Sequence, residues 1–102
     1  MPRIIFQSSN HKRFENGIMV SHDYAPRQIT LDYNSNGTML TISIFPTLSP
    51  KQAMFVRDSG NLLVYRGLDP DYRFEVETKS DNTIKRVSVI RLDRNLELRF
   101  LE

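Results

Sequence analysis

Residues 33–50 read YNSNGTMLTISIFPTLSP and contain no Asp, Glu, Lys or Arg. These four residue types make up 25% of the whole chain, so a run of this length without any of them is exceptional here. Within the run, Thr38–Phe45 alternates Leu and Ile with Thr, Ser and Met, which is the period of a β-strand. A strand with no charge on either face is either covered on both sides by its own protein or meets another chain.

Turn signals recur on both sides of this strand. Asn16-Gly17 and Asn36-Gly37 are strong hairpin signals, because Asn and Gly both accept a positive φ. Similar turn chemistry occurs at 58–61, 67–71, 80–83 and 93–95, and runs rich in β-branched and aromatic residues lie between the turns. The sequence therefore predicts an all-β fold: a single antiparallel meander that forms a small barrel or sandwich of about seven to nine short strands.

The hairpin that contains the uncharged strand has two possible registers. A loop over 34–37 sets Leu31 opposite Leu40, whereas a tight turn on Asn36-Gly37 shifts the partners by two residues. Both registers keep the same side chains on the inner face, because the side-chain period of a strand is two. The inner face of Thr38–Phe45 is therefore predicted independently of the turn.

Two more hairpins follow near the C-terminus. A turn on Asp81-Asn82 sets Phe74 opposite Val89 and places opposite charges, Glu77 and Arg86, across the outer face. The register of the next hairpin uses the other face of the strand that the two hairpins share.

A three-residue loop at Asp93–Asn95 pairs Leu92 with Leu96 and Ile90 with Leu98. We favour a β-bulge near Val89-Ile90, which would bring the apolar residues of both registers onto one core, over a strand buried on both sides, because Lys85, Arg86 and Arg91 need contact with water. The predicted core, from all strands together, is Ile4, Phe6, Ile18, Val20, Ile29, Leu31, Leu40, Ile42, Ile44, Val64, Phe74, Val76, Val87, Val89, Ile90, Leu98 and Phe100.

One segment predicts a helix instead of a strand. Leu48-Ser49-Pro50-Lys51-Gln52 has the order of an apolar N′ residue, a Ser N-cap, Pro at N1 and Gln at N3. The turn at 58–60 follows closely, so we expect at most one short helical turn near 49–54, leading into a strand at Met54–Arg57.

Composition limits the class of protein. The chain has 102 residues, which is the length of one domain, residues 1–102. It has 14 basic and 12 acidic residues, and this small excess of positive charge does not indicate an anionic partner. The chain has no cysteine, which excludes disulfides and thiolate metal sites. The apolar N-terminal run is too short for a signal-peptide core and no stretch has transmembrane length, so we expect an intracellular, cytoplasmic protein without a membrane partner.

Patterns that could carry catalysis or bind a metal are weak. His22-Asp23-Tyr24 offers a base beside a carboxylate, but neighbouring residues of an extended chain point away from one another. Asp32, Asn34 and Asn36-Gly37 match the first half of a calcium loop, whose final bidentate Glu position is Ser43 here. We therefore predict a binding protein in preference to an enzyme, with no cofactor and no metal.

A short resemblance occurs at Asp58–Tyr65, DSGNLLVY, which is similar to one repeat of the bulb-type mannose-binding lectins. Asn61 and Tyr65 match the sugar motif of that repeat, whereas Arg57 and Ser59 stand where the motif has Gln and Asp. The similarity covers less than a tenth of the chain, and those lectins repeat the unit three times. We interpret it as shared hairpin chemistry and do not transfer sugar binding.

Three functional classes follow from the sequence. The favoured one is a protein–protein interaction or assembly module that associates with a protein partner or with itself, most simply as a homodimer. Its contact surface would be the outer side chains of the uncharged strand and the two residues after the helical turn, because Met and Phe supply adaptable apolar area. The proposed interface residues are Met39, Thr41, Ser43, Phe45, Met54 and Phe55.

The alternatives use other residues. A barrel that binds or converts a small ligand in its interior would use His22, Tyr24, Tyr65 and Arg66 as polar groups. A small nucleic-acid-binding barrel would use Lys12, Arg13, Tyr65 and Tyr72. The nucleic-acid class is disfavoured, because the acidic residues that alternate with basic ones remove the expected electrostatic footprint.

Overall fold

The computed structural model describes residues 3–102, and within them every regular element is a β-strand. The strands number ten, one more than the upper end of the predicted range, and the all-β antiparallel fold predicted from the sequence is confirmed. Their bounds are β1 Arg3–Ser8, β2 Asn10–Glu15, β3 Ile18–Asp23, β4 Arg27–Tyr33, β5 Met39–Phe45, β6 Leu48–Ser59, β7 Leu62–Gly67, β8 Tyr72–Thr78, β9 Ile84–Arg91 and β10 Leu96–Leu101.

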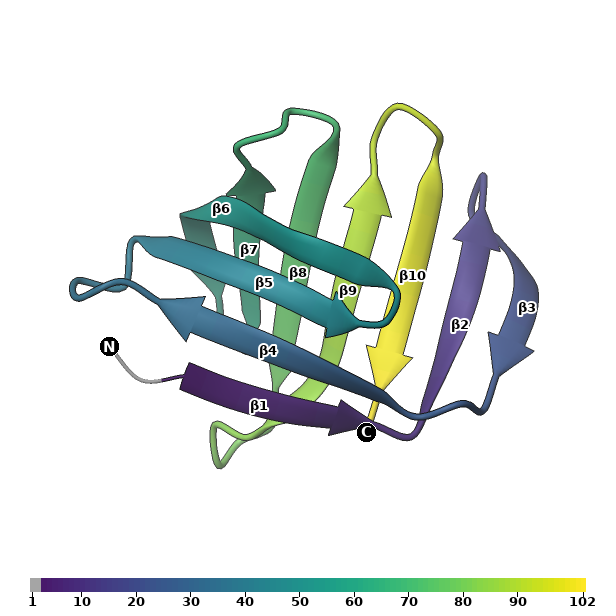
Figure 1. Ribbon diagram of the computed structural model, residues 1–102, viewed down its shortest axis with the longest axis horizontal. Coiled ribbons are helices and arrows are strands. Elements are labelled where there is room, and N and C mark those ends of the chain that lie inside the picture. Colours follow the sequence, from purple (N-terminus) through teal and green to yellow (C-terminus); the bar gives the residue numbers. More distant parts are fainter. Residues whose placement is uncertain (1–2) are drawn as a thin grey trace.

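The ten strands form one curled sheet, a half-barrel, in the order β1-β4-β5-β6-β7-β8-β9-β10-β2-β3. Figure 1 shows β1, β4, β5 and β6 as a front layer, which crosses a rear layer of β7 to β10, β2 and β3 at a steep angle. β6 joins the layers at one corner, because its 12 residues pair first with β5 and then with β7.

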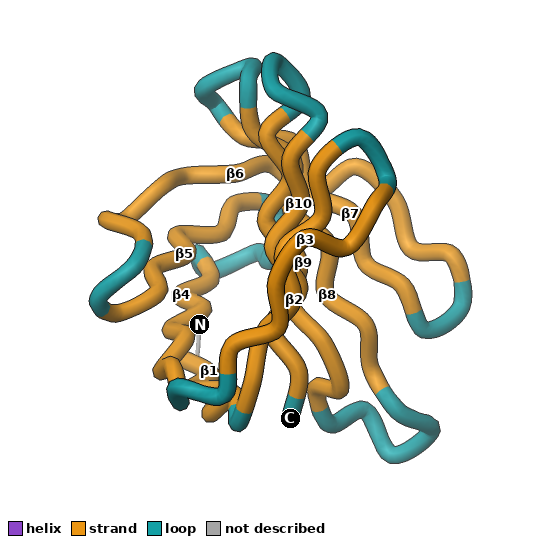
Figure 2. Tube along the Cα trace, turned by 90° about the vertical axis from the view of Figure 1, so that its right-hand side faces the viewer, coloured by secondary structure: helices purple, strands orange, loops and turns teal. Residues whose placement is uncertain are grey.

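A bent hairpin joins the layers at another corner. Only Ser9 separates β1 from β2, and only three residues separate β3 from β4, so the two arms of the hairpin pass together from the front layer to the rear. Figure 2 shows this corner from the side, with β2 and β3 toward the viewer. Asn16 and Gly17 close the hairpin with φ of 53° and 79°, the positive values that their sequence predicts.

Apolar side chains fill the space between the layers. Inward positions of β4 and β5 (Ile29, Leu31, Leu40, Ile42 and Ile44) pack against inward positions of the rear strands. The rear contribution is Tyr65, Phe74, Val76, Val87, Val89 and Phe100. The alternation along β5 is complete, so the inner half of the uncharged run belongs to the core of its own chain.

Two of the predicted registers are confirmed. Leu31 pairs with Ile42, which is the register of the tight Asn36-Gly37 alternative. Phe74 pairs with Val89, and Glu77 pairs with Arg86, as the Asp81-Asn82 turn predicts.

The register predicted for the last hairpin is wrong by one residue. Arg91 pairs with Leu96 and Val89 with Leu98, and the ladder between β9 and β10 has no bulge. Leu92 is not paired with β10. Its N–H donates instead to the carbonyl of Asp71, at 2.8 Å, beside the start of β8. As a result Ile90, which the sequence placed in the core, lies half-buried on the outer side of β9, and its prediction as a core residue is wrong.

The helical turn predicted near 49–54 is also wrong, because Leu48–Ser59 is a continuous strand. Ile42 pairs with Lys51 and Ile44 with Leu48, so Ser43 alone faces both Ser49 and Pro50. Pro50, which has no N–H to donate, therefore sits in a β-bulge where the ladder is already interrupted. The two neighbouring strands satisfy the backbone groups that a helix would have satisfied locally.

Three residues of the predicted core are on the surface. Ile18 and Val20 lie on β3, an edge strand whose six residues are all exposed, and Ile4 lies on β1 at the other end of the strand order. Alternating apolar residues on an edge strand look the same in sequence as those on a central strand, because the difference is the presence of a covering layer. Ala53 and Tyr65 are buried although the sequence did not place them in the core.

Candidate functional site

The outward side chains of β1, β4, β5 and β6 form a surface that we call the neutral face. Successive rows across it join Ile5 to Thr30 and Ser43, and Gln7 to Gln28 and Phe45. Its members are Arg3, Ile5, Gln7, Gln28, Thr30, Asp32, Met39, Thr41, Ser43, Phe45, Gln52 and Met54. The single acid and single base in this set neutralise each other, because Arg3 Nε donates to Asp32 Oδ1 at 2.8 Å.

Phe45 is the most exposed large apolar side chain of the neutral face, with 78% of its surface accessible. It ends β5 at the tip of the β5–β6 hairpin, opposite Gln28. Met39, Thr41 and Ser43, on the same side of β5, are half-buried by their neighbours in the sheet. The four outer side chains predicted from the sequence therefore share one surface, and no other element of residues 3–102 forms a layer over it.

The side chains of Met54 and Phe55 lie on opposite sides of β6. Met54 pairs with Met39 and extends the neutral face onto β6. Phe55 points to the opposite side of β6, where its ring meets that of Tyr65 edge-on with 5.7 Å between centroids. Five of the six interface residues predicted from the sequence thus lie together, and Phe55 covers an end of the core.

The outward side of β8, β9 and β10 has the opposite character, and we call it the charged face. Its members are Arg73, Glu75, Glu77, Arg86, Glu97 and Arg99. Arg86 lies at the centre, with 16% of its side chain exposed; its Nε donates to Glu77 Oε1 at 3.0 Å. Arg86 Nη1 lies 3.6 Å from Glu75 Oε1 and 3.8 Å from Glu97 Oε2. The charges of this face are thus already paired within the chain.

The edge strand β3 is a second exposed apolar feature, and sequence reasoning missed it by placing Ile18 and Val20 in the core. Ile18, Met19 and Val20 are all at least half exposed, and β3 pairs with β2 alone. The residues that pair with it include Arg13, opposite Ser21, and Phe14, opposite Met19, with Val20 in a bulge between them. A bulge twists an edge strand and makes it a poorer template for another strand.

The structure does not gather the polar groups predicted for an interior ligand. His22 and Tyr24 are exposed at the β3 end of the bent hairpin; Tyr24 Oη lies 3.2 Å from His22 Nδ1, and His22 Nε2 lies 2.9 Å from Asn10 Oδ1. Tyr65 is buried in another part of the sheet, where its hydroxyl lies 3.2 Å from that of Tyr33. Burial raises the pKa of Tyr65 far above its ordinary value, which keeps the phenol neutral. Arg66 is exposed on β7.

The residues predicted for nucleic-acid binding are also dispersed. Lys12 and Arg13 are on β2, whereas Tyr72 begins β8 and stacks on Phe74 with 5.9 Å between ring centroids. The guanidinium of Arg91 lies over the ring of Tyr72, 4.7 Å from the ring centroid, so one face of this ring is already occupied. Tyr65 and Tyr72 line one hollow, but Lys12 and Arg13 are not among its residues.

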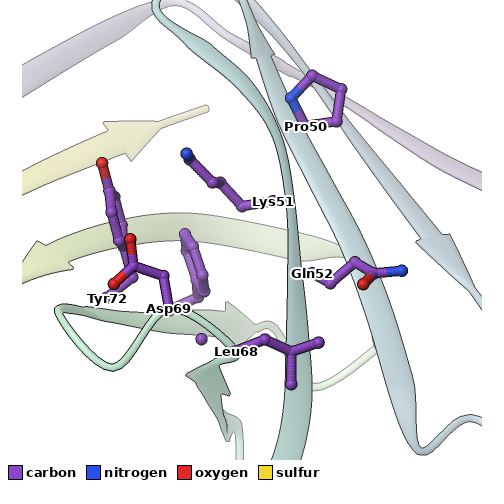
Figure 3. Close-up of a pocket in the computed structure, with 8 residues that line it drawn as sticks. Pro50, Lys51, Gln52, Leu68, Asp69 and Tyr72 are labelled. Atoms are coloured by element: carbon purple, nitrogen blue, oxygen red, sulfur yellow. The ribbon is translucent and has the colours of Figure 1, made fainter.

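The surface hollows of the protein are shallow. One of about 340 Å³ lies where β6 passes the β7–β8 turn, and Figure 3 shows Lys51, Asp69 and Tyr72 together on one side of it while Gln52 points away. Gly67 is one of its lining residues, and a side chain does not fit there because a Cβ would be 2.7 Å from the carbonyl oxygen of Asp69. The lining offers an ammonium group and a carboxylate, and no hydroxyl or thiol nucleophile paired with a base.

Comparisons with known protein families, curated proteins and solved structures give no match to this chain. Residues 3–102 include no helix that is long and apolar enough to cross a membrane. The same residues hold no group of three or more His, Cys, Asp or Glu side chains placed to bind a metal ion.

Proposed function

We propose that this protein is a protein–protein interaction module that associates with a second copy of itself through the neutral face. The observation that supports the proposal is the composition of this face: apart from one internal ion pair, Arg3–Asp32, its residues are Thr, Ser, Gln, Met, Ile and Phe. Depletion of charge together with enrichment in Met and aromatic residues is characteristic of the core of interfaces.

The energetics favour association at this face over the charged face. Burying Phe45, which is now 78% exposed, contributes roughly 1.5–3 kcal/mol. Hydroxyl and amide groups can exchange water for partners across an interface at small net cost. Covering the charged face would remove water from six ionised side chains, which costs more, whereas the neutral face has a single ion pair.

A second copy is a suitable occupant because the surface is self-complementary in charge. A two-fold axis places the same patch on both subunits, so a patch with a net charge would repel its copy. The neutral face has one acid and one base, joined at 2.8 Å, and the whole chain has a formal charge of only +2. Neither quantity opposes pairing of two copies.

Sedimentation velocity over a concentration series tests this proposal. We expect a monomer–dimer equilibrium that Phe45→Glu shifts to monomer. Leu92→Glu is the matched control, because Leu92 is also an exposed apolar residue but lies in the β9–β10 loop. A wild-type protein that stays monomeric at millimolar concentration would contradict the proposal. Dissociation by Val20→Lys but not by Phe45→Glu would contradict it too, by assigning the contact to the edge of β3.

A further inference from the structure

Three arginines surround one hollow of the surface, at the corner where β6 turns from the front layer to the rear. The hollow has a volume of about 220 Å³ and is lined by Arg57 of β6, Arg66 of β7 and Arg73 of β8. We call it the arginine hollow. It is separate from the neutral face and from the hollow in Figure 3, with which it shares only Tyr72.

The register of the sheet brings these like charges together. Arg66 and Arg73 are direct cross-strand partners, and Arg57 is the partner of Val64, two residues before Arg66. Like charges placed directly opposite each other destabilise a sheet. The arrangement therefore costs stability unless something negative lies between the guanidinium groups.

The chain itself supplies too little negative charge. Only Arg73 has a carboxylate partner, with Nη2 at 2.8 Å from Glu75 Oε2. The other oxygen of Glu75 lies 3.6 Å from Arg86, so this carboxylate is shared. Among residues 3–102, neither Arg57 nor Arg66 has an acidic side chain within salt-bridge distance. The Nε–H of Arg73 is buried and has no hydrogen-bond partner in this part of the chain.

The floor and rim of the hollow are apolar. Val64 forms a buried floor, and Val56 and Leu92, each about half exposed, form part of the rim together with Tyr72. Val56 is exposed because it is the extra residue of a bulge: Phe55 pairs with Tyr65 and Arg57 with Val64. The bulge also sets Arg57, in place of Val56, opposite Val64. Guanidinium groups above an apolar floor are less screened by water than fully solvated ones.

We propose that the arginine hollow binds the anionic group, phosphate or carboxylate, of a small ligand whose apolar part lies against Val56 and Leu92. The planar fork of arginine matches both anions with paired N–H donors. The volume of about 220 Å³ is below that of pockets that enclose a whole cofactor, so the hollow receives one anionic group and a few attached carbons.

Titration with phenyl phosphate and with benzoate tests the proposal and separates the two anions. Binding is followed in low salt by the NMR signals of the arginine Nε–H groups and by calorimetry. We expect saturable binding of at least one probe, with the Nε–H signals of Arg57, Arg66 and Arg73 shifting most. The probe that binds more tightly identifies which anion, phosphate or carboxylate, the hollow prefers. Added salt should weaken binding without abolishing it.

Variants locate the site. Arg66→Gln and Arg57→Gln should each weaken binding about tenfold or more, the effect of losing a charge-assisted hydrogen bond, and leave the melting temperature unchanged or raised. Arg94→Gln is the matched control, because Arg94 is an exposed arginine of the β9–β10 loop that lies near Asp93 instead. No saturable binding of either probe, or equal weakening by the Arg94 variant, would overturn the proposal.

Discussion

β5 and β9 occupy comparable positions, each with a neighbouring strand on both sides and each burying one row of side chains in the same core. On the outer side of β5 are Met39, Thr41, Ser43 and Phe45, whereas the outer side of β9 has Arg86 and Ser88 under a network of carboxylates. Both strands pair with a neighbouring strand on each side. The difference between their outer faces is one of charge: the side chains of β9 join an ion-pair network, whereas those of β5 are uncharged.

The ionised side chains of the charged face form ion pairs with one another. Arg86 has three carboxylates within 4 Å, and it also donates to the buried hydroxyl of Ser88. A partner that covered this face would have to replace water around groups that are already paired. The neutral face has no such network, and this contrast is why we propose that two copies meet there.

The largest expected effect tests the core that both faces share. Phe74→Ala should lower the free energy of unfolding by about 3–5 kcal/mol, because Phe74 is fully buried and its truncation leaves a cavity. Phe45→Ala, an equal truncation on the neutral face, should change the stability of the monomer by less than about 0.5 kcal/mol. Urea unfolding of dilute protein measures both. Similar losses for the two variants would show that Phe45 is packed and is not available to a partner.

The next effect compares the ion pairs of the two faces. Arg86→Ala should cost about 1–3 kcal/mol, less than a fully buried pair, because it leaves Glu75, Glu77 and Glu97 partly buried and facing one another. Arg3→Ala on the neutral face should leave the melting temperature unchanged, because the side chain of Arg3 is 64% exposed. Thermal unfolding measures both variants, and a greater loss for the Arg3 variant would reverse the assignment of the two faces.

The smallest effect concerns the bent hairpin that joins the layers. His11 of β2 stacks on Phe100, with 5.0 Å between ring centroids, and burial lowers its pKa below the ordinary value of 6.5. The charged and titratable groups around it are Asp23, 3.8 Å from Nε2, together with Arg27 and His22. Because the unfolded chain takes up this proton first, the contribution of His11 to stability is complete above pH 6.5 and is lost as the pH falls through the folded pKa.

Unfolding midpoints measured from pH 7 down to about pH 5 test this expectation. His11→Phe keeps an aromatic ring against Phe100 and should flatten the dependence. The dependence should persist in His22→Gln, because burial, and not His22, is the main cause of the lowered pKa of His11. A wild-type midpoint that rises on acidification in this range would contradict the sign.

Local patterns in the sequence predicted the features that depend on neighbours along the chain. Asn16-Gly17 closes a hairpin, Phe74 faces Val89, and the inner residues of β5 are buried, because turn chemistry and side-chain alternation decide these features. The same reasoning located Met39, Thr41, Ser43 and Phe45 on one outer surface.

Features that depend on distant strands could not be predicted. Ser49-Pro50 has the order of a helix start. The segment is a strand instead, because its first half pairs with β5 and its second half with β7, and Pro50 lies in a bulge. Ile18 and Val20 alternate like core residues, and only the position of β3 at the edge exposes them. Sequence reasoning named Arg66, Tyr65 and Tyr72, which line the arginine hollow, under two separate alternatives. It did not group them with Arg57 and Arg73, because the cross-strand register brings these residues together from separate strands.

A dilution series followed by two-dimensional ¹H–¹⁵N NMR tests the central claim most directly, because it reports every backbone amide at once. Between about 1 mM and about 10 μM, we expect concentration-dependent shifts at Met39–Phe45 and at the paired residues Gln28–Asp32, with the amides of β9 unchanged. Shifts confined to β9 or to Ile18–Asp23, or a spectrum that does not change with concentration, would contradict the assignment of the neutral face as the surface where two copies meet.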